Sequence, residues 1–222
     1  MRSPRIGLLP LYIALYDDAV PEARAGMEAF YQTIAAALRG RGLEVETSAI
    51  CRLAPEFADA VTRFEGAEVD AIVTLHLAYS PSLESADVLA ATPLPLIVLD
   101  TTPAYRFGAD VDPAEIMANH GIHGVQDLCN LLLRRGKDFQ IEAGHWEHSD
   151  VLDRVAAWAQ AAQIASGLRR ARVGLIGEPF TGMGDFALPV ATLHRTLGLT
   201  VVQADPGVIA SYVPAEDDPA IA

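Results

Sequence analysis

Short apolar runs alternate with longer amphipathic stretches through the first 150 residues, and this alternation limits the fold more than any other feature. Strands separated by helical segments indicate βαβ units, in which the strands lie parallel. The predicted strands are Ile6–Leu9, Leu43–Thr47, Ala71–Leu75, Leu96–Leu99 and Phe139–Glu142. The predicted helices are Pro21–Arg39, Pro55–Glu65, Ser82–Ala91 with Ser82 as N-cap, Gly121–Arg135 and Ser149–Leu168. The chain is therefore predicted to be an α/β protein, with the second strand at an edge of the sheet.

The predicted elements divide the chain into three parts. Residues 1–150 supply a complete doubly wound, five-stranded parallel sheet of the flavodoxin-like, three-layer αβα type, and residues 151–170 form a connecting helix. Residues 171–222 start a second α/β domain, with strands at Val173–Gly177 and Thr200–Gln203 and a helix at Leu188–Leu197. Two strands and a helix bury too little apolar surface to close a core alone. We therefore expect an incomplete second βαβ unit, from a truncated chain or one that pairs with a separate polypeptide.

The charge balance argues against two classes of partner. The sequence has 29 acidic and 16 basic residues, which gives a formal net charge of −13. Binding to nucleic acid or to an anionic membrane requires clustered Lys and Arg, and the basic residues here stand mainly near predicted helix C-termini. No apolar run approaches the roughly 20 residues that cross a bilayer. We expect neither nucleic acid nor membrane as a partner.

The cysteines and the N-terminus favour a cytoplasmic protein. Cys51 and Cys129 lie far apart in dissimilar contexts, which is typical of a reduced environment. The N-terminal residues lack the order of charged, apolar and small residues that marks a signal peptide.

Polar and aromatic residues follow the predicted strands, at the edge where open parallel sheets bind ligands. The segment Asn119–Gln126 opens the helix before the fifth strand, so it belongs to the same edge. Imidazole, amide and phenol groups exchange hydrogen bonds with a neutral polyol, whereas an anion would require Lys and Arg. A sugar-like ligand is therefore predicted. The residues at this edge are Tyr12, Tyr16–Asp18, His76, Tyr79, Asp100–Thr101, Asn119, His120, His123, Gln126 and His145–Trp146.

Other functions for these residues stay open at this point. A histidine at a strand end is often structural, Tyr79 could belong only to a turn, and Asp17–Asp18 is typical of a solvated turn. His120 and His123 share one side of a helix and could bind zinc with His145, but no Cys or Glu stands beside them at ligand spacing, so no metal site is assigned.

The loop Gly177–Phe186 has three glycines that could suggest a nucleotide. It lacks the G-x-G-x-x-G spacing and a P-loop lysine, and its acidic residues Glu178 and Asp185 would repel phosphate. We expect Met183 to face an apolar sugar surface or a neighbouring domain.

Five segments, in order and spacing, resemble the N-terminal half of the L-fucose/L-arabinose isomerase family, and the resemblance extends to about residue 205. It implies a cytoplasmic, oligomeric aldose–ketose isomerase that uses Mn²⁺, whose N-terminal domain contributes substrate contacts to the active site of an adjacent subunit. By this resemblance the contacts include His76, His120, His123, Gln126 and Met183. The segments are Gly7–Tyr12, His76–Pro81, Asn119–Gly124, Gly144–Trp146 and Gly177–Phe186.

The sequence departs from that family in length and in its catalytic residues. Family members are considerably longer, and their metal-binding and proton-transferring residues come from a part beyond residue 222, so the catalytic residues are unknown here. Mn²⁺ would belong to the complete enzyme, not to this chain alone. Pro10–Tyr12 replaces a Gln-containing turn of arabinose isomerases, which leaves the sugar open between a pentose and a deoxyhexose.

The prediction is thus the N-terminal portion of a metal-dependent isomerase, working as a homo-oligomer or with a missing catalytic part. A free-standing flavodoxin-like module that binds sugar or regulates, without catalysis, is the alternative.

Overall fold

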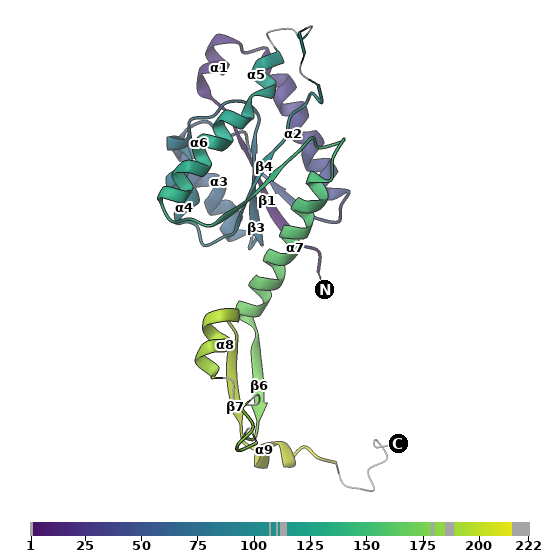
Figure 1. Cartoon of the computed structure of the whole chain (residues 1–222), viewed down its shortest axis with the longest axis vertical. Helices are drawn as coiled ribbons and strands as arrows, with labels where there is room; N and C mark the ends of the chain where they lie inside the picture. The colour runs from purple at the N-terminus through teal and green to yellow at the C-terminus, as the bar shows by residue number, and fades with distance from the viewer. Residues whose placement is uncertain are drawn as a thin grey trace. The chain divides into compact units, whose positions relative to one another are not determined.

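The structure is a computed structural model, and it describes residues 2–106, 108–109, 111, 115–178, 180–184 and 189–214. The chain divides into two compact units, Met1–Gln163 and Ile164–Ala222. The boundary falls inside the helix that follows the fifth strand. The two units are drawn in Figure 1, and each is described by itself.

The first unit is built on a five-stranded sheet in which all neighbouring strands are parallel. The strand order is β2-β1-β3-β4-β5, which confirms the doubly wound α/β fold and the edge position of the second strand. The order reverses between β1 and β3, and ligands of such sheets bind at this reversal. The strands are β1 (Arg5–Leu11), β2 (Glu44–Thr47), β3 (Ala71–His76), β4 (Leu96–Asp100) and β5 (Phe139–Ala143).

Helices cover both faces of the sheet and complete three layers (Figure 1). One face packs against α2 (Ala23–Arg39) and the first part of α7 (Val151–Arg170). The other face packs against α3 (Ala54–Gly66), α4 (Ala86–Ala91) and α6 (Gly121–Arg134). Burial on both faces explains why the central strands are continuous apolar runs. Among the described residues, none of the helices combines the length and the apolar composition needed to cross a bilayer.

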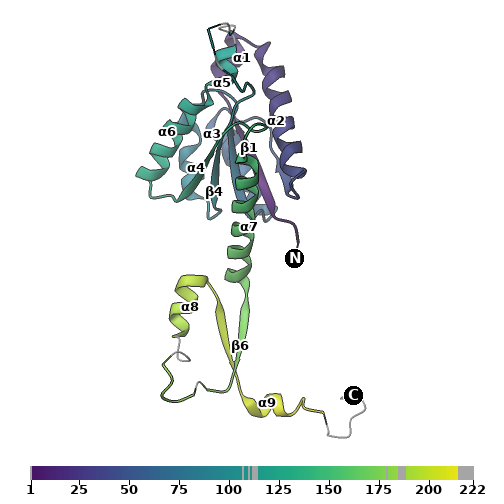
Figure 2. The same cartoon turned by 45° about the vertical axis from the view of Figure 1, so that its right-hand side comes forward.

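Two short helices lie beyond the carboxyl ends of the strands, and the sequence pattern predicts neither of them. Figures 1 and 2 place α1 (Ala14–Ala19) beside α5 (Ile116–Asn119) at this edge. Neither helix has a fully buried residue, so neither has a core face that periodicity could reveal.

The predicted helix over Ser82–Ala91 is divided into η1 (Ser82–Glu84) and α4. The N-cap prediction for Ser82 is wrong. Pro81 holds the N-cap position, and Ser82 Oγ instead donates a hydrogen bond to Asp127 Oδ2 at 2.7 Å. This bond ties the loop after β3 to α6.

The second unit contains the predicted βαβ arrangement. Strands β6 (Arg172–Ile176) and β7 (Thr200–Ala204) are parallel, with α8 (Val190–Leu197) between them in the chain and α9 (Pro206–Ala210) after them. Helix α8 ends at Gly198 with φ of 74°, a conformation that glycine adopts without strain. The predicted start of this helix, Leu188, is outside the described residues. Apolar side chains of both strands are exposed: Val173, Leu175, Ile176 and Val202.

Gly7 is required by the packing of α3 on β1. A Cβ at this position would lie 2.5–2.7 Å from three ring carbons of the buried Phe64. We expect Gly7→Ala to lower the free energy of unfolding by about 1–3 kcal/mol, because overpacking forces the ring or the strand to shift. Urea unfolding measures the change. Gly26→Ala is the control, since a Cβ there meets nothing within 4 Å; a Gly7→Ala protein as stable as this control would contradict the expectation.

Candidate functional site

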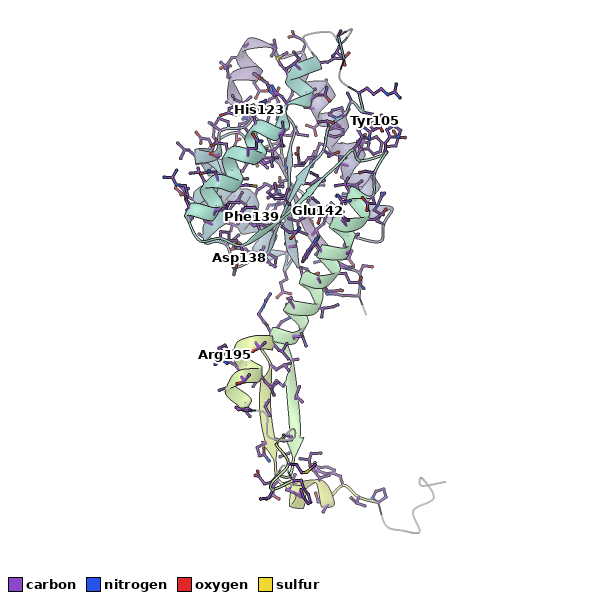
Figure 3. All side chains as sticks on the ribbon, viewed as in Figure 1. Tyr105, His123, Asp138, Phe139, Glu142 and Arg195 are labelled. Atoms are coloured by element: carbon purple, nitrogen blue, oxygen red, sulfur yellow. The ribbon has the colours of Figure 1, made fainter. Side chains whose placement is uncertain are left out.

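Five ring side chains gather at the carboxyl ends of β1 and β3, where the strand order reverses. We call them the ring cluster: Tyr12 after β1, Tyr16 on α1, Tyr79 after β3, His120 before α6, and His123 on α6. Ring centroids are 6.0 Å apart for Tyr12 and Tyr16, 6.4 Å for Tyr79 and His120, and 5.9 Å for His120 and His123. Figure 3 shows His123 toward this end of the sheet and Phe139, the first residue of β5, toward the other.

A hydrogen bond joins Tyr16 and His120 across the cluster, with 3.2 Å between Tyr16 Oη and His120 Nε2. Burial lowers the pKa of His120 below its ordinary value of 6.5, and the neighbouring His123 lowers it further. Burial also raises the pKa of Tyr16. Both side chains are therefore uncharged near neutral pH. With Tyr16 as donor, His120 Nε2 is the acceptor and Nδ1 carries the imidazole proton.

His76 lies under the first turn of α6, and only 3% of its surface is exposed. A Cβ on Gly124 would lie 2.8 Å from His76 Cδ2 and 2.9 Å from Ser80 Oγ. A Cβ on Gly121 would lie 2.6 Å from the His76 carbonyl oxygen. The two glycines therefore let the helix rest directly on β3 and its following loop. Burial lowers the pKa of His76 to about 3, so its ring is neutral.

Several buried polar atoms at this edge have no hydrogen-bond partner among the described residues. Leaving such an atom unpaired costs about 1–3 kcal/mol, so folded proteins keep few of them. Each of these atoms belongs to a residue in the second half of a strand or in the segment that follows a strand. Their concentration at one edge points to a polar ligand or to ordered water. The atoms are Tyr12 Oη, Thr74 Oγ1, both ring nitrogens of His76, Ser80 Oγ, Thr101 Oγ1 and Trp146 Nε1.

Two predicted site residues lie at the same edge but outside the ring cluster. The side-chain amide of Asn119 is held by the backbone: Oδ1 accepts from Ala104 N at 2.9 Å, and Nδ2 donates to Glu115 O at 2.8 Å. Gln126 is exposed on α6, three residues after His123 and thus on the same side of the helix. Their contact with a ligand stays a prediction.

His145 belongs to a second aromatic group, with Tyr105 and His148. Its Nδ1 accepts hydrogen bonds from Glu147 N and His148 N, both at 3.2 Å, and its ring stacks on His148 with centroids 4.9 Å apart. Tyr105 lies 5.3 Å from the His145 ring and 4.3 Å from the His148 ring. His145 thus shapes the loop before α7.

No group of three or more His, Cys, Asp or Glu side chains within the described part of the chain is placed to hold a metal ion. The zinc set of His120, His123 and His145 is therefore not assembled. The described residues also lack the ligand set that Mn²⁺ would need.

Met183 is 44% exposed and lies in the second unit. Its glycine-rich loop is described only over residues 177–178 and 180–184. A contact between Met183 and a sugar stays a prediction.

Tyr16 is among the residues predicted at this edge, but the sequence does not predict its hydrogen bond to His120 or the ion pairs beside it. Asp17, predicted to lie in a solvated turn, instead binds Arg24 at 3.1 Å and Arg52 at 2.7 Å. The Arg24 guanidinium lies 5.1 Å from the centre of the Tyr12 ring. These contacts anchor α1 to the edge of the sheet, and no local sequence signal indicates a partner as distant as Arg52.

Comparisons with known proteins give one partial similarity in sequence. No family model matches the chain. A 69-residue segment is 33% identical to L-arabinose isomerase of Herpetosiphon aurantiacus, and it covers 30% of this chain and only 14% of that protein. The similarity indicates a distant relation to part of that enzyme.

Among solved structures, the Escherichia coli transcriptional repressor ascG aligns with 95% of this chain and 82% of its own chain. The sequence identity is 14% and the TM-score is 0.31, so no conclusion about fold or function is drawn from this similarity.

Proposed function

We propose that this chain supplies the sugar-contacting part of a metal-dependent aldose–ketose isomerase of the L-arabinose/L-fucose type. The observation that supports the proposal is the ring cluster at the β1/β3 reversal, where imidazole and phenol groups converge. The choice of an isomerase is supported by the partial similarity to L-arabinose isomerase.

The chemistry of the cluster suits a neutral polyol. Imidazole and phenol groups exchange hydrogen bonds with hydroxyls, and aromatic faces pack on apolar surface. The buried hydroxyls of Tyr12 and Ser80 offer further donors and acceptors near the same strands. The neighbouring cations do not favour an anion, because Arg24 binds Asp17 and Arg52 binds both Asp17 and Glu56.

The metal and the carboxylates of the isomerisation would come from outside these 222 residues. In the proposed complete enzyme, Mn²⁺ polarises the sugar oxygens while a carboxylate moves the proton. The source of these groups is another part of the polypeptide or another subunit of a cytoplasmic homo-oligomer. The Mn²⁺-loaded chain alone is therefore expected to form no ketose from L-arabinose or L-fucose in a colorimetric ketose assay. Turnover by the purified chain would contradict this division of roles.

Sugar binding tests the proposal directly. We expect the chain to bind L-arabinose or L-fucose, and His120→Ala to weaken the affinity at least about tenfold, because a lost hydrogen bond leaves polar groups unpaired. Calorimetric titration measures the affinity. The control is His148→Ala, which removes an exposed histidine outside the ring cluster. Absence of binding to both sugars, or equal losses in the two variants, would overturn the proposed site.

A further inference from the structure

Ring opening is a separate chemical requirement for any enzyme that converts a cyclic aldose to a ketose. The closed sugar must lose the proton on O1, break the bond between C1 and the ring oxygen, and gain a proton on that oxygen. These are general acid–base steps that need no metal and no redox partner. Groups able to perform them must offer one acceptor and one donor close together.

We propose that Tyr16 and His120 open the ring of the bound aldose, so that this chain by itself catalyses the interconversion of sugar anomers. The inference rests on the proposed sugar site and adds an activity to it. The distance of 3.2 Å between Tyr16 Oη and His120 Nε2 presents a phenol donor and an imidazole acceptor side by side. The two oxygens bonded to C1 of a cyclic aldose are also neighbours, so one sugar can engage both protein atoms.

The step balances without any other reactant. His120 Nε2 takes the proton from O1, the electrons of the breaking bond go to the ring oxygen, and Tyr16 donates its proton to that oxygen. The open-chain aldehyde then lies beside an imidazolium and a phenolate, and proton return from His120 to Tyr16 restores both groups. Rotation about the C1–C2 bond and the reverse step close the ring as the other anomer.

The surroundings hold the pair in its uncharged form. Tyr79 packs edge-on against His120, and Tyr12 packs edge-on against Tyr16. Burial lowers the pKa of His120, so Nε2 keeps a free lone pair at neutral pH. Asp17 on α1 pairs with Arg24 and Arg52, and Arg52 pairs also with Glu56, so two carboxylates balance the two guanidinium groups. The titratable groups that face His120 are Tyr16, Tyr79 and His123.

Nuclear magnetic resonance exchange spectroscopy of L-arabinose and L-fucose anomers tests the proposal. We expect the full chain to accelerate anomer exchange above the buffer rate, and Tyr16→Phe to lower the protein-dependent rate about 100-fold. The Phe ring keeps the aromatic packing and removes only the acid. His120→Asn should lose the acceleration as well. His148→Ala is the control and should retain the wild-type rate.

The outcomes separate this inference from the proposed function. A Tyr16→Phe protein that still binds sugar but, at sugar concentrations that saturate it, no longer accelerates exchange supports the inference. Wild-type binding without acceleration overturns the inference and leaves the sugar site in place. Absence of binding overturns both. Equal acceleration by wild type and Tyr16→Phe shows that the pair is not the catalyst.

Discussion

Replacing His76 with leucine is expected to make the folded protein more resistant to acid. Burial lowers the pKa of His76 to about 3 from its ordinary value of 6.5. Between these values the unfolded chain binds a proton that the folded chain does not. The free energy of unfolding therefore falls as the pH drops through this window, by about 1.4 kcal/mol per pH unit. A leucine at position 76 cannot titrate, so this part of the pH dependence should disappear.

Urea unfolding at pH 6.5 and at about pH 4.5 measures the effect. Between these two pH values the wild type should lose about 2 kcal/mol more than His76→Leu, since the unfolded histidine is already half protonated at pH 6.5. Near neutral pH the variant should be at least as stable, because leucine has a similar volume and removes two buried nitrogens without partners among the described residues. The control is His148→Leu, which removes an exposed histidine instead. Parallel pH profiles for wild type and His76→Leu would show that His76 is not a neutral, buried group in solution.

The position of His76 could be predicted from the sequence, but its burial could not. The pattern of apolar runs predicts five parallel strands because burial on both faces leaves a signal that local periodicity carries. His76 is the last residue of β3, so its place at the carboxyl edge follows from the pattern. The burial of His76 under α6 cannot be predicted in this way, because it depends on Gly121 and Gly124, more than 40 positions later in the chain.

The same limit applies to the ring cluster. The sequence pattern places all five residues of the ring cluster at this edge, but it does not predict that Tyr16 pairs with His120, which lies 104 residues away. Asn119 belongs to the predicted segment, yet its amide binds backbone groups of Ala104 and Glu115, a role that composition does not show. Long-range pairing is therefore the part of this site that only the structure supplies.

Gly121→Ala is expected to damage the fold and the site together. A Cβ at this position would lie 2.6 Å from the carbonyl oxygen of His76. That oxygen belongs to the backbone of β3, which pairs with β1 on one side and β4 on the other, so it cannot move aside cheaply. The first turn of α6 must shift instead, and with it His120 and His123. The free energy of unfolding should fall toward the upper part of the range of about 1–3 kcal/mol for overpacking, despite the better helix propensity of alanine.

Sugar binding should weaken as well, because a shift of the first turn separates His120 from Tyr16. We expect at least about a tenfold loss of affinity for L-arabinose or L-fucose, measured by calorimetry under conditions in which circular dichroism shows the variant to be folded. Gly66→Ala is the matched control, since Gly66 ends α3 and a Cβ there meets nothing within 4 Å. A folded Gly121→Ala protein with wild-type affinity would mean that the first turn of α6 does not position the sugar contacts. Loss of affinity in Gly121→Ala but not in Gly66→Ala instead ties the ring cluster to the close approach of α6 and β3.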